Sequence, residues 1–100
     1  MTTSIQELDG KLVATLCGEL DTAAAPAAEQ ALQPLLASQG KDIIIDCTQL
    51  EYIASSGLRI LLNILKQAKE HGSRVVLKNV NEVVKDVLEL TGFISIFEFE

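Results

Sequence analysis

The run Ile43-Ile44-Ile45 limits the possible folds more than any other feature of this sequence. Three consecutive β-branched residues, with no alternation of polar and apolar side chains, are typical of a strand at the centre of a parallel sheet. Parallel neighbours cannot be joined by tight turns, because the chain must cross back over the sheet, usually through a helix. We therefore expect a buried strand over 42–46, with helices before and after it.

Turn signals and hydrophobic patterns divide the rest of the chain into similar elements. Asp9-Gly10 predicts a two-residue hairpin turn near the start. The predicted strands cover 5–8, 11–17, 42–46, 74–77 and 94–99, and the predicted helices cover 23–38, 56–70 and 82–90. This β-β-α-β-α-β-α-β order predicts a single α/β domain over residues 1–100, with a mixed, mostly parallel sheet and right-handed crossovers.

Several local expectations accompany this order. Asp21 or Thr22 should cap the helix over 23–38, and Pro34 should kink that helix or thin its last turn. Asn81 should cap the last helix. We expect a loop over 47–54. The strand over 11–17 is apolar on both sides, which suits coverage on both faces of the sheet.

Composition and charge argue against several classes of function. The formal net charge is -6 and the eight Lys and Arg residues are scattered, so no surface for nucleic acid or anionic lipid is indicated. Neither a membrane-spanning run nor a secretion signal is visible, and we expect a cytoplasmic protein without membrane insertion. A monomer is favoured, with self-association through an edge strand left open.

No catalytic or metal-binding set can be assembled from the side chains, so we expect neither an enzyme nor a cofactor. Cys17 and Cys47 lie far apart in the sequence, so they give no metal-binding pattern. We expect both to be small, buried, apolar side chains. The only histidine, His71, falls in the last turn of a predicted helix. Asp21, Asp46 and Glu51 could cluster, but isolated carboxylates are more often caps and solvated loop residues.

The stretch Ala54-Ser55-Ser56-Gly57 marks the start of the helix over 56–70. The first N–H groups of a helix lack partners and the helix dipole is positive there, so a serine can act as a cap or carry a phosphate. No acidic residue follows in the first turn, where Arg59 stands instead. A plain serine cap is the commoner outcome for such a pattern, and both interpretations stay open.

Topology and helical spacing add two further expectations. If the strands over 11–17 and 42–46 are neighbours, the loops at their carboxyl ends bring Asp21 close to Ser55. Ile60 and Ile64 widen the inward stripe of the helix over 56–70. Burial is the default for such an edge, whereas an exposed ridge of these two residues would be a docking surface beside Ser55.

Three segments together carry a family resemblance: Gly-Glu-Leu-Asp over 18–21, Asp-Cys-Thr-Gln-Leu-Glu-Tyr-Ile-Ala-Ser-Ser-Gly-Leu over 46–58, and Thr-Gly-Phe over 91–93. In this order and spacing they resemble the STAS domain family, and more specifically its stand-alone bacterial anti-sigma factor antagonists. The resemblance extends over nearly all of the chain and implies a mixed sheet with helices, in agreement with the order predicted above.

The resemblance also implies a function. Such proteins bind an anti-sigma factor that is also a serine kinase, which frees the sigma factor for transcription. Phosphorylation of a serine, here Ser55 with Ser56 as second choice, breaks the complex, and a PP2C-type phosphatase restores it. The residues expected at the partner interface are Asp21, Ser55, Ser56, Gly57, Arg59, Ile60 and Ile64.

One departure from the family pattern keeps an alternative open. Ala54 stands where the family often has an aspartate before the modified serine. The alternative is a STAS interaction subunit of a lipid-transport ATPase complex, which would bind through the same helix without a cycle of phosphorylation.

Overall fold

Five strands form one sheet, and their order across the sheet follows their order in the chain, β1-β2-β3-β4-β5. The computed structural model describes residues 1–100. The strands are β1 (Thr2–Leu8), β2 (Lys11–Leu20), β3 (Ile43–Ile53), β4 (Val75–Lys78) and β5 (Glu98–Phe99). Only the β1–β2 pair is antiparallel, and the other three pairs are parallel. The predicted α/β fold with a mixed, mostly parallel sheet is confirmed.

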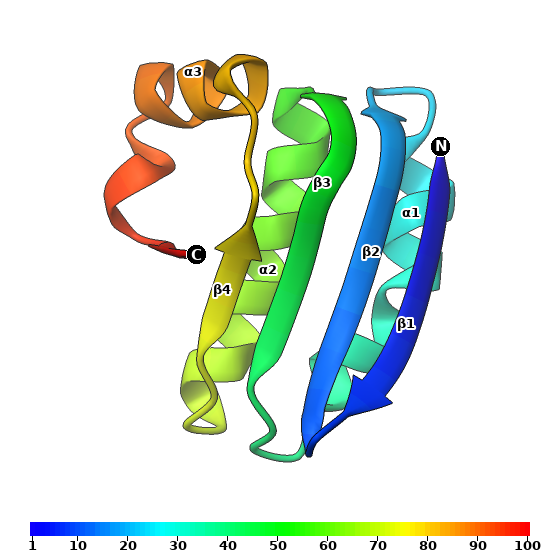
Figure 1. The fold of residues 1–100 in the computed structure, drawn as a ribbon, viewed down its shortest axis with the longest axis vertical. Helices are drawn as coiled ribbons and strands as arrows, with labels where there is room; N and C mark the ends of the chain where they lie inside the picture. The colour runs from blue at the N-terminus through cyan, green and yellow to red at the C-terminus, as the bar shows by residue number, and fades with distance from the viewer.

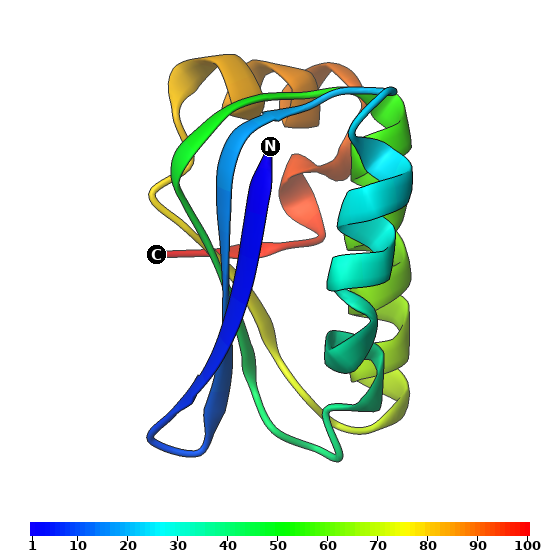
Figure 2. The ribbon, with the colours of Figure 1, turned by 90° about the vertical axis from the view of Figure 1, so that its right-hand side faces the viewer.

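Three α-helices and two short 3-10 helices connect the strands (Figure 1). Helices α1 and α2 cover one face of the sheet, and α3 closes one end (Figure 2). Their bounds are Ala25–Ala31 for α1, Gln33–Ala37 for η1, Ser55–Glu70 for α2, Glu82–Leu90 for α3 and Phe93–Ser95 for η2. The buried core lies between the sheet and these helices.

The second face of the sheet carries no helix (Figure 2). Val13, Ile44 and Val76 lie side by side on it, in register across three strands, and remain half-buried. The expectation that the second strand is covered on both faces is therefore wrong. Apolar residues can stand on this face because neighbouring β-branched side chains shield one another across the strands.

β3 is much longer than its sequence predicts, since it continues through the expected loop over 47–54 as far as Ile53. β2 likewise runs on to Leu20, and the two strands stay paired through two register irregularities. Polar residues such as Thr48 and Gln49 suggested a loop, but in this part of the strand they are exposed. Backbone pairing with β2 carries the strand through them, since strand preference depends strongly on the neighbouring strands.

Turn and capping residues act largely as their types predict. Asp9 and Gly10 both have positive φ, at 53° and 77°, as a type I′ hairpin turn requires. Asn81 caps α3, because its side-chain oxygen accepts a hydrogen bond from the Val84 N–H at 2.8 Å. The last strand, expected over 94–99, keeps only Glu98–Phe99, since the turn η2 occupies the residues just before.

The predicted helix over 23–38 is divided. α1 ends at Ala31, and the 3-10 helix η1 carries Pro34 in its first turn. Proline has no N–H to donate to the carbonyl four residues earlier, so the α-helical bonding pattern stops there. Pro34 therefore acts as predicted, although its effect is a change of helix type rather than a kink.

Candidate functional site

β2 and β3 end at the same edge of the sheet, and this juxtaposition builds the site. The Ala54 N–H donates a hydrogen bond to the Leu20 carbonyl at 2.9 Å, and Leu20 pairs with Ile53. Asp21 directly follows Leu20, and Ser55 directly follows Ala54. The strands are therefore neighbours as predicted, and the segments that begin with Asp21 and Ser55 leave the sheet at the same edge.

Gly57 allows α2 to begin close against the two strand ends. A Cβ atom at this position would lie 2.7 Å from Leu20 Cγ and 2.9 Å from Ile53 Cγ1, closer than real contacts allow. Gly57 is itself buried in the first turn of α2. It therefore positions the helix that carries the serines, and it offers no side chain or exposed surface to a partner, contrary to its expected place at the interface.

The N-terminus of α2 has no side-chain cap. The N-cap position is Ala54, in extended conformation, and Ser55 and Ser56 are the first helical residues rather than caps. Of the two interpretations left open for these serines, the plain cap is therefore wrong. No acidic residue follows in the first turn. The N–H groups there keep their capacity to bind an anion, supported by the helix dipole.

The two hydroxyl groups differ in accessibility. Ser55 is exposed, whereas Ser56 is half-buried, and its Oγ is shielded from solvent without any hydrogen-bond partner. A modifying enzyme needs an accessible nucleophilic oxygen, so Ser55 is the better placed of the two. Arg59, one turn further along α2 than Ser55, is also exposed.

Ile60 and Ile64 do not form an exposed ridge. Their exposed fractions are 5% and 1%, and both belong to the hydrophobic core. α1 and η1 pack against α2 and cover this side of it. The two isoleucines therefore stabilise the packing of the helices and are not part of a docking surface, which corrects their place in the expected interface.

The carboxylates near the site have separate roles. Asp21 is half-buried, and its Oδ1 accepts a hydrogen bond from the Ala24 N–H at 2.8 Å, which caps the turn before α1. The helix itself begins after Ala24 without a side-chain cap, so neither Asp21 nor Thr22 caps it as expected. Glu51 and Asp21 both line a hollow of about 800 Å³ beside β1 and α1, together with Glu19. No sequence pattern indicated this hollow, because its walls come from α1 and β1, which lie apart in the chain.

Asp46 lies elsewhere, on the uncovered face of the sheet. Its Oδ1 accepts hydrogen bonds from the Thr48 hydroxyl at 2.5 Å and the Thr48 N–H at 3.0 Å. These two bonds, the side-chain bond first, hold the pKa of Asp46 below its usual range, with a smaller contribution from Lys78. Asn79 in turn donates to the Thr48 hydroxyl at 2.9 Å.

The histidine and the cysteines occupy structural positions. His71 is the C-cap of α2. Cys47 is buried, as expected, and burial raises the pKa of its thiol to about 12, so it stays protonated. Cys17 is only half-buried, contrary to expectation, because it lies on the uncovered face, where its thiol donates to Gln49 Oε1 at 3.1 Å.

Comparison with known proteins assigns this arrangement to a family. The family model of the STAS domain matches residues 2–100. The chain belongs to the STAS domain family. It is 33% identical to BtrV of Bordetella bronchiseptica over 97 residues, which are 97% of this chain and 84% of that protein. It is 28% identical to the anti-sigma-B factor antagonist of Bacillus subtilis over 94% of this chain and 85% of that protein.

A solved structure supports the same assignment. The crystal structure of an anti-sigma factor antagonist from Mycobacterium paratuberculosis superposes with a TM-score of 0.83 and 32% identity, covering 98% of this STAS chain and 83% of that one. These three relatives of the STAS domain are named as anti-sigma factor antagonists. None of its helices has both the length and the apolar character needed to span a membrane.

The close seating of α2 gives a first prediction. Gly57→Ala should lower the free energy of unfolding by about 1–3 kcal/mol, because the added methyl group overlaps Leu20 and Ile53 and outweighs the better helix propensity of alanine. Urea titration followed by circular dichroism measures this. Ser56→Ala is the matched control in the same turn, and it should be neutral or stabilising because the Ser56 Oγ has no partner. Equal stability of Gly57→Ala and wild type would contradict the tight seating.

The bonds to Asp46 give a second prediction. Thr48→Val should raise the pKa of Asp46, since the side-chain donor is lost while the backbone donor remains. A carboxyl group whose pKa is lower in the folded state than in the unfolded state stabilises the fold at every pH above its unfolded-state pKa. This stabilisation is lost as the pH falls through the folded-state pKa. The variant should therefore lose stability at neutral pH and approach wild type in acid. NMR titration of the Asp46 carboxyl carbon reports the pKa, and Lys78→Gln should change it less; an unchanged pKa in Thr48→Val would refute the assignment.

Proposed function

We propose that this STAS domain is an anti-sigma factor antagonist switched by phosphorylation of Ser55. In its unmodified form it binds an anti-sigma factor that is also a serine kinase, and so frees the sigma factor. The observation that carries the proposal is the exposed Ser55 at the uncapped N-terminus of α2, beside Asp21. The anti-sigma factor antagonists among its homologues support the general function.

The geometry favours a phosphate that changes docking without disrupting the fold. A phosphoserine at position 55 carries a charge of about -1.5 to -2. The first N–H groups of α2 and the guanidinium of Arg59 can receive that charge, and no acidic residue of the first turn opposes it. The phosphorylated domain should therefore keep its structure.

Partner binding is the step that the phosphate opposes. A docking partner has to desolvate the phosphate, and the carboxylate of Asp21 adds like-charge repulsion nearby. A shift from nearly all bound to nearly all free needs about 5.5 kcal/mol of differential affinity. Desolvation of a doubly charged group in a protein interface is large enough to supply such a difference.

The proposal includes the other members of the cycle. The kinase is the anti-sigma factor itself, and a PP2C-type phosphatase removes the phosphate. We place this cycle in the cytoplasm, with the antagonist acting as a monomer. Asp21, Ser55 and Arg59 are the side chains proposed to face the partner. Ser56 contributes at most through its backbone, because its hydroxyl is shielded from solvent.

Ala54 favours one alternative function. An aspartate often precedes the modified serine in the family, and its absence here is compatible with a STAS subunit of a lipid-transport ATPase complex that is never phosphorylated. Co-purification from the native cells distinguishes the two. A transporter ATPase would support the alternative, and an ATP-binding anti-sigma factor would support the proposal.

Phosphorylation provides a third prediction. Incubation with the cognate anti-sigma kinase and ATP should add one phosphate at Ser55, located by mass spectrometry. Ser55→Ala should abolish the modification and keep partner binding, whereas Ser55→Asp should weaken binding by about tenfold or more, which is about 1.4 kcal/mol. Ser56→Ala is the control and should still be phosphorylated. A phosphate found on Ser56, or none on the wild type, would contradict the proposed switch.

Asp21 provides a fourth prediction, because its charge can be separated from its capping bond. Asp21→Asn keeps an oxygen that accepts from the Ala24 N–H, so its stability should stay near wild type, whereas Asp21→Ala should cost about 0.5–2 kcal/mol. If Asp21 repels the phosphate, phosphorylated Asp21→Asn should retain more partner affinity than the phosphorylated wild type. Calorimetric titration of the partner into wild type and Asp21→Asn, each with and without the phosphate, measures the coupling between Asp21 and the phosphate. If the phosphate weakens binding equally in both proteins, Asp21 is not part of the switch.

A further inference from the structure

A hollow of about 800 Å³ opens between the edge strand β1 and helix α1. Of the two elements that border it, α1 lies on the helix-covered face of the sheet and β1 is an edge strand (Figures 1 and 2). Thr2 and Thr3 of β1 form one wall, and residues of α1 and of the turn before it form the opposite wall. The hollow is large enough for several side chains of a ligand, within the usual range of binding pockets.

The outer edge of β1 is free to pair with another strand. β1 has seven residues, Thr2–Leu8, and has a neighbour on one side only. Proteins usually protect such edges with proline, lysine, bulges or covering elements. β1 contains neither proline nor lysine and pairs with β2 without a register shift. Its unpaired N–H and C=O groups extend over about 23 Å, enough for an extended segment of similar length.

The α1 wall stays open because its side chains are small. Ala27 and Ala31 lie four residues apart on this face of α1, Ala23 lies in the turn before the helix, and all three are exposed. Side chains four apart stack along one face of a helix, so Ala27 and Ala31 keep the space beside β1 free along α1, and Ala23 extends it to the preceding turn. An edge strand beside an open groove along a helix is the arrangement in which peptides bind by strand addition.

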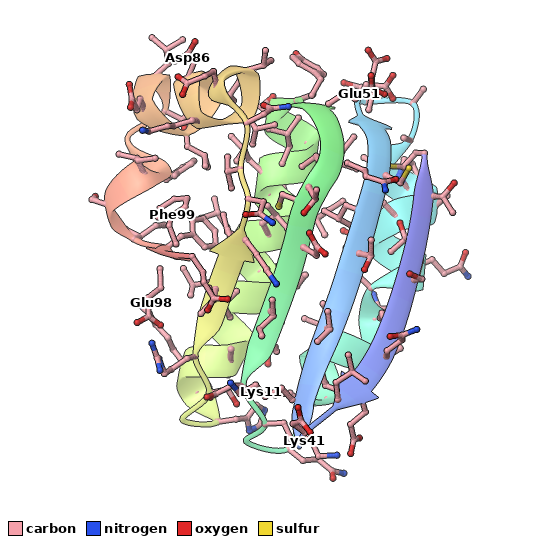
Figure 3. All side chains as sticks on the ribbon, in the orientation of Figure 1. Lys11, Lys41, Glu51, Asp86, Glu98 and Phe99 are labelled. Carbon is pink, nitrogen blue, oxygen red and sulfur yellow. The ribbon has the colours of Figure 1, made fainter.

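The charges around the hollow define the chemistry of its occupant. Three carboxylates, those of Glu19, Asp21 and Glu51, line it, and no Lys or Arg does. Figure 3 shows Glu51 at this end of the sheet, whereas Lys11 and Lys41 lie at the opposite end. These acids do not form a metal-binding group. A segment that carries Lys or Arg side chains would complement the charge.

A second copy of this chain is less suitable as the occupant. Each copy has a formal net charge of -6, and β1 itself offers Glu7 but no basic side chain. Two chains of this net charge repel each other, which opposes the pairing of two β1 edges. A basic segment of a different protein meets no such repulsion.

We propose that the hollow between β1 and α1 binds an extended, basic segment of a protein partner, which pairs with β1 as an additional strand. Its Lys or Arg side chains point toward Glu19 and Glu51, and the small side chains of α1 leave room for their aliphatic stems. The surface adjoins the Ser55 site through Asp21, but strand pairing at β1 does not require phosphorylation. The inference therefore goes beyond the proposed function and can be tested separately from it.

The test uses a synthetic peptide of about nine residues with alternating Lys and Thr, titrated into isotope-labelled protein at low salt. Backbone amides of β1, together with those of residues lining the hollow, should show the largest NMR shifts. A matching peptide with Glu in place of Lys should not bind. Two further peptides carry N-methyl groups on alternate residues, in opposite phase, so that only one of them loses the N–H groups that face β1.

Strand pairing predicts that one N-methylated peptide binds and the other does not. Equal binding of both would show charge attraction without strand addition and would overturn the proposal, as would the absence of shifts in β1. Because Ser55 is not involved, Ser55→Ala should bind the peptide like wild type. A failed phosphorylation experiment therefore leaves this result unaffected, and a failed peptide titration leaves the proposed switch unaffected.

Substitutions in the groove complete the test. Ala27→Leu should fill the hollow and weaken peptide binding by about tenfold or more, while Gln30→Leu, an exposed residue of α1 outside the lining, should not. The double variant Glu19→Gln, Glu51→Gln should also weaken binding, whereas the exposed Glu89→Gln should not. Circular dichroism verifies that each variant is folded. A wild-type dimer in sedimentation that Ala27→Leu converts to a monomer would assign the hollow to a second copy and overturn the proposal.

Discussion

The contact of Gly57 with Leu20 and Ile53 is the constraint on which the functional end of this domain depends. Because position 57 has no side chain, the first turn of α2 rests directly on the ends of β2 and β3. The hydrogen bond from Ala54 to Leu20 then holds the two strand ends at one level. Asp21 and Ser55 follow these contacts directly in the chain, so their proximity is a consequence of backbone packing.

Much of this arrangement could be predicted from the sequence, because it depends on local signals and on the order of the elements. The Asp9-Gly10 turn, the cap at Asn81 and the effect of Pro34 each rest on the chemistry of one residue type. The approach of Asp21 to Ser55 needed only the assumption that two successive parallel strands are neighbours. The fold class followed from the same features, and the resemblance to the STAS family rested on the motifs over 18–21, 46–58 and 91–93.

The predictions that the structure corrects concern places where the local structure depends on contacts with distant parts of the chain. β3 extends through polar residues such as Thr48 because β2 lies beside it as a pairing partner. Ile60 and Ile64 are buried, as the default interpretation expected, and only their place at the partner interface is corrected, because α1 and η1 pack against α2. The hollow beside β1 could not be foreseen for the same reason, since its walls come from separate elements.

The division of α1 from η1 has a consequence for the dynamics of the domain. α1 has seven residues, no side-chain cap and Pro26 in its first turn, so its own helical propensity cannot maintain it. It is held by the burial of a few side chains, Ala25, Ala28 and the adjoining Leu32. Elements with so little buried surface open at a lower free energy than the rest of the protein. Amide hydrogen exchange in α1 should therefore be faster than in α2, and one wall of the hollow can adjust to what enters it.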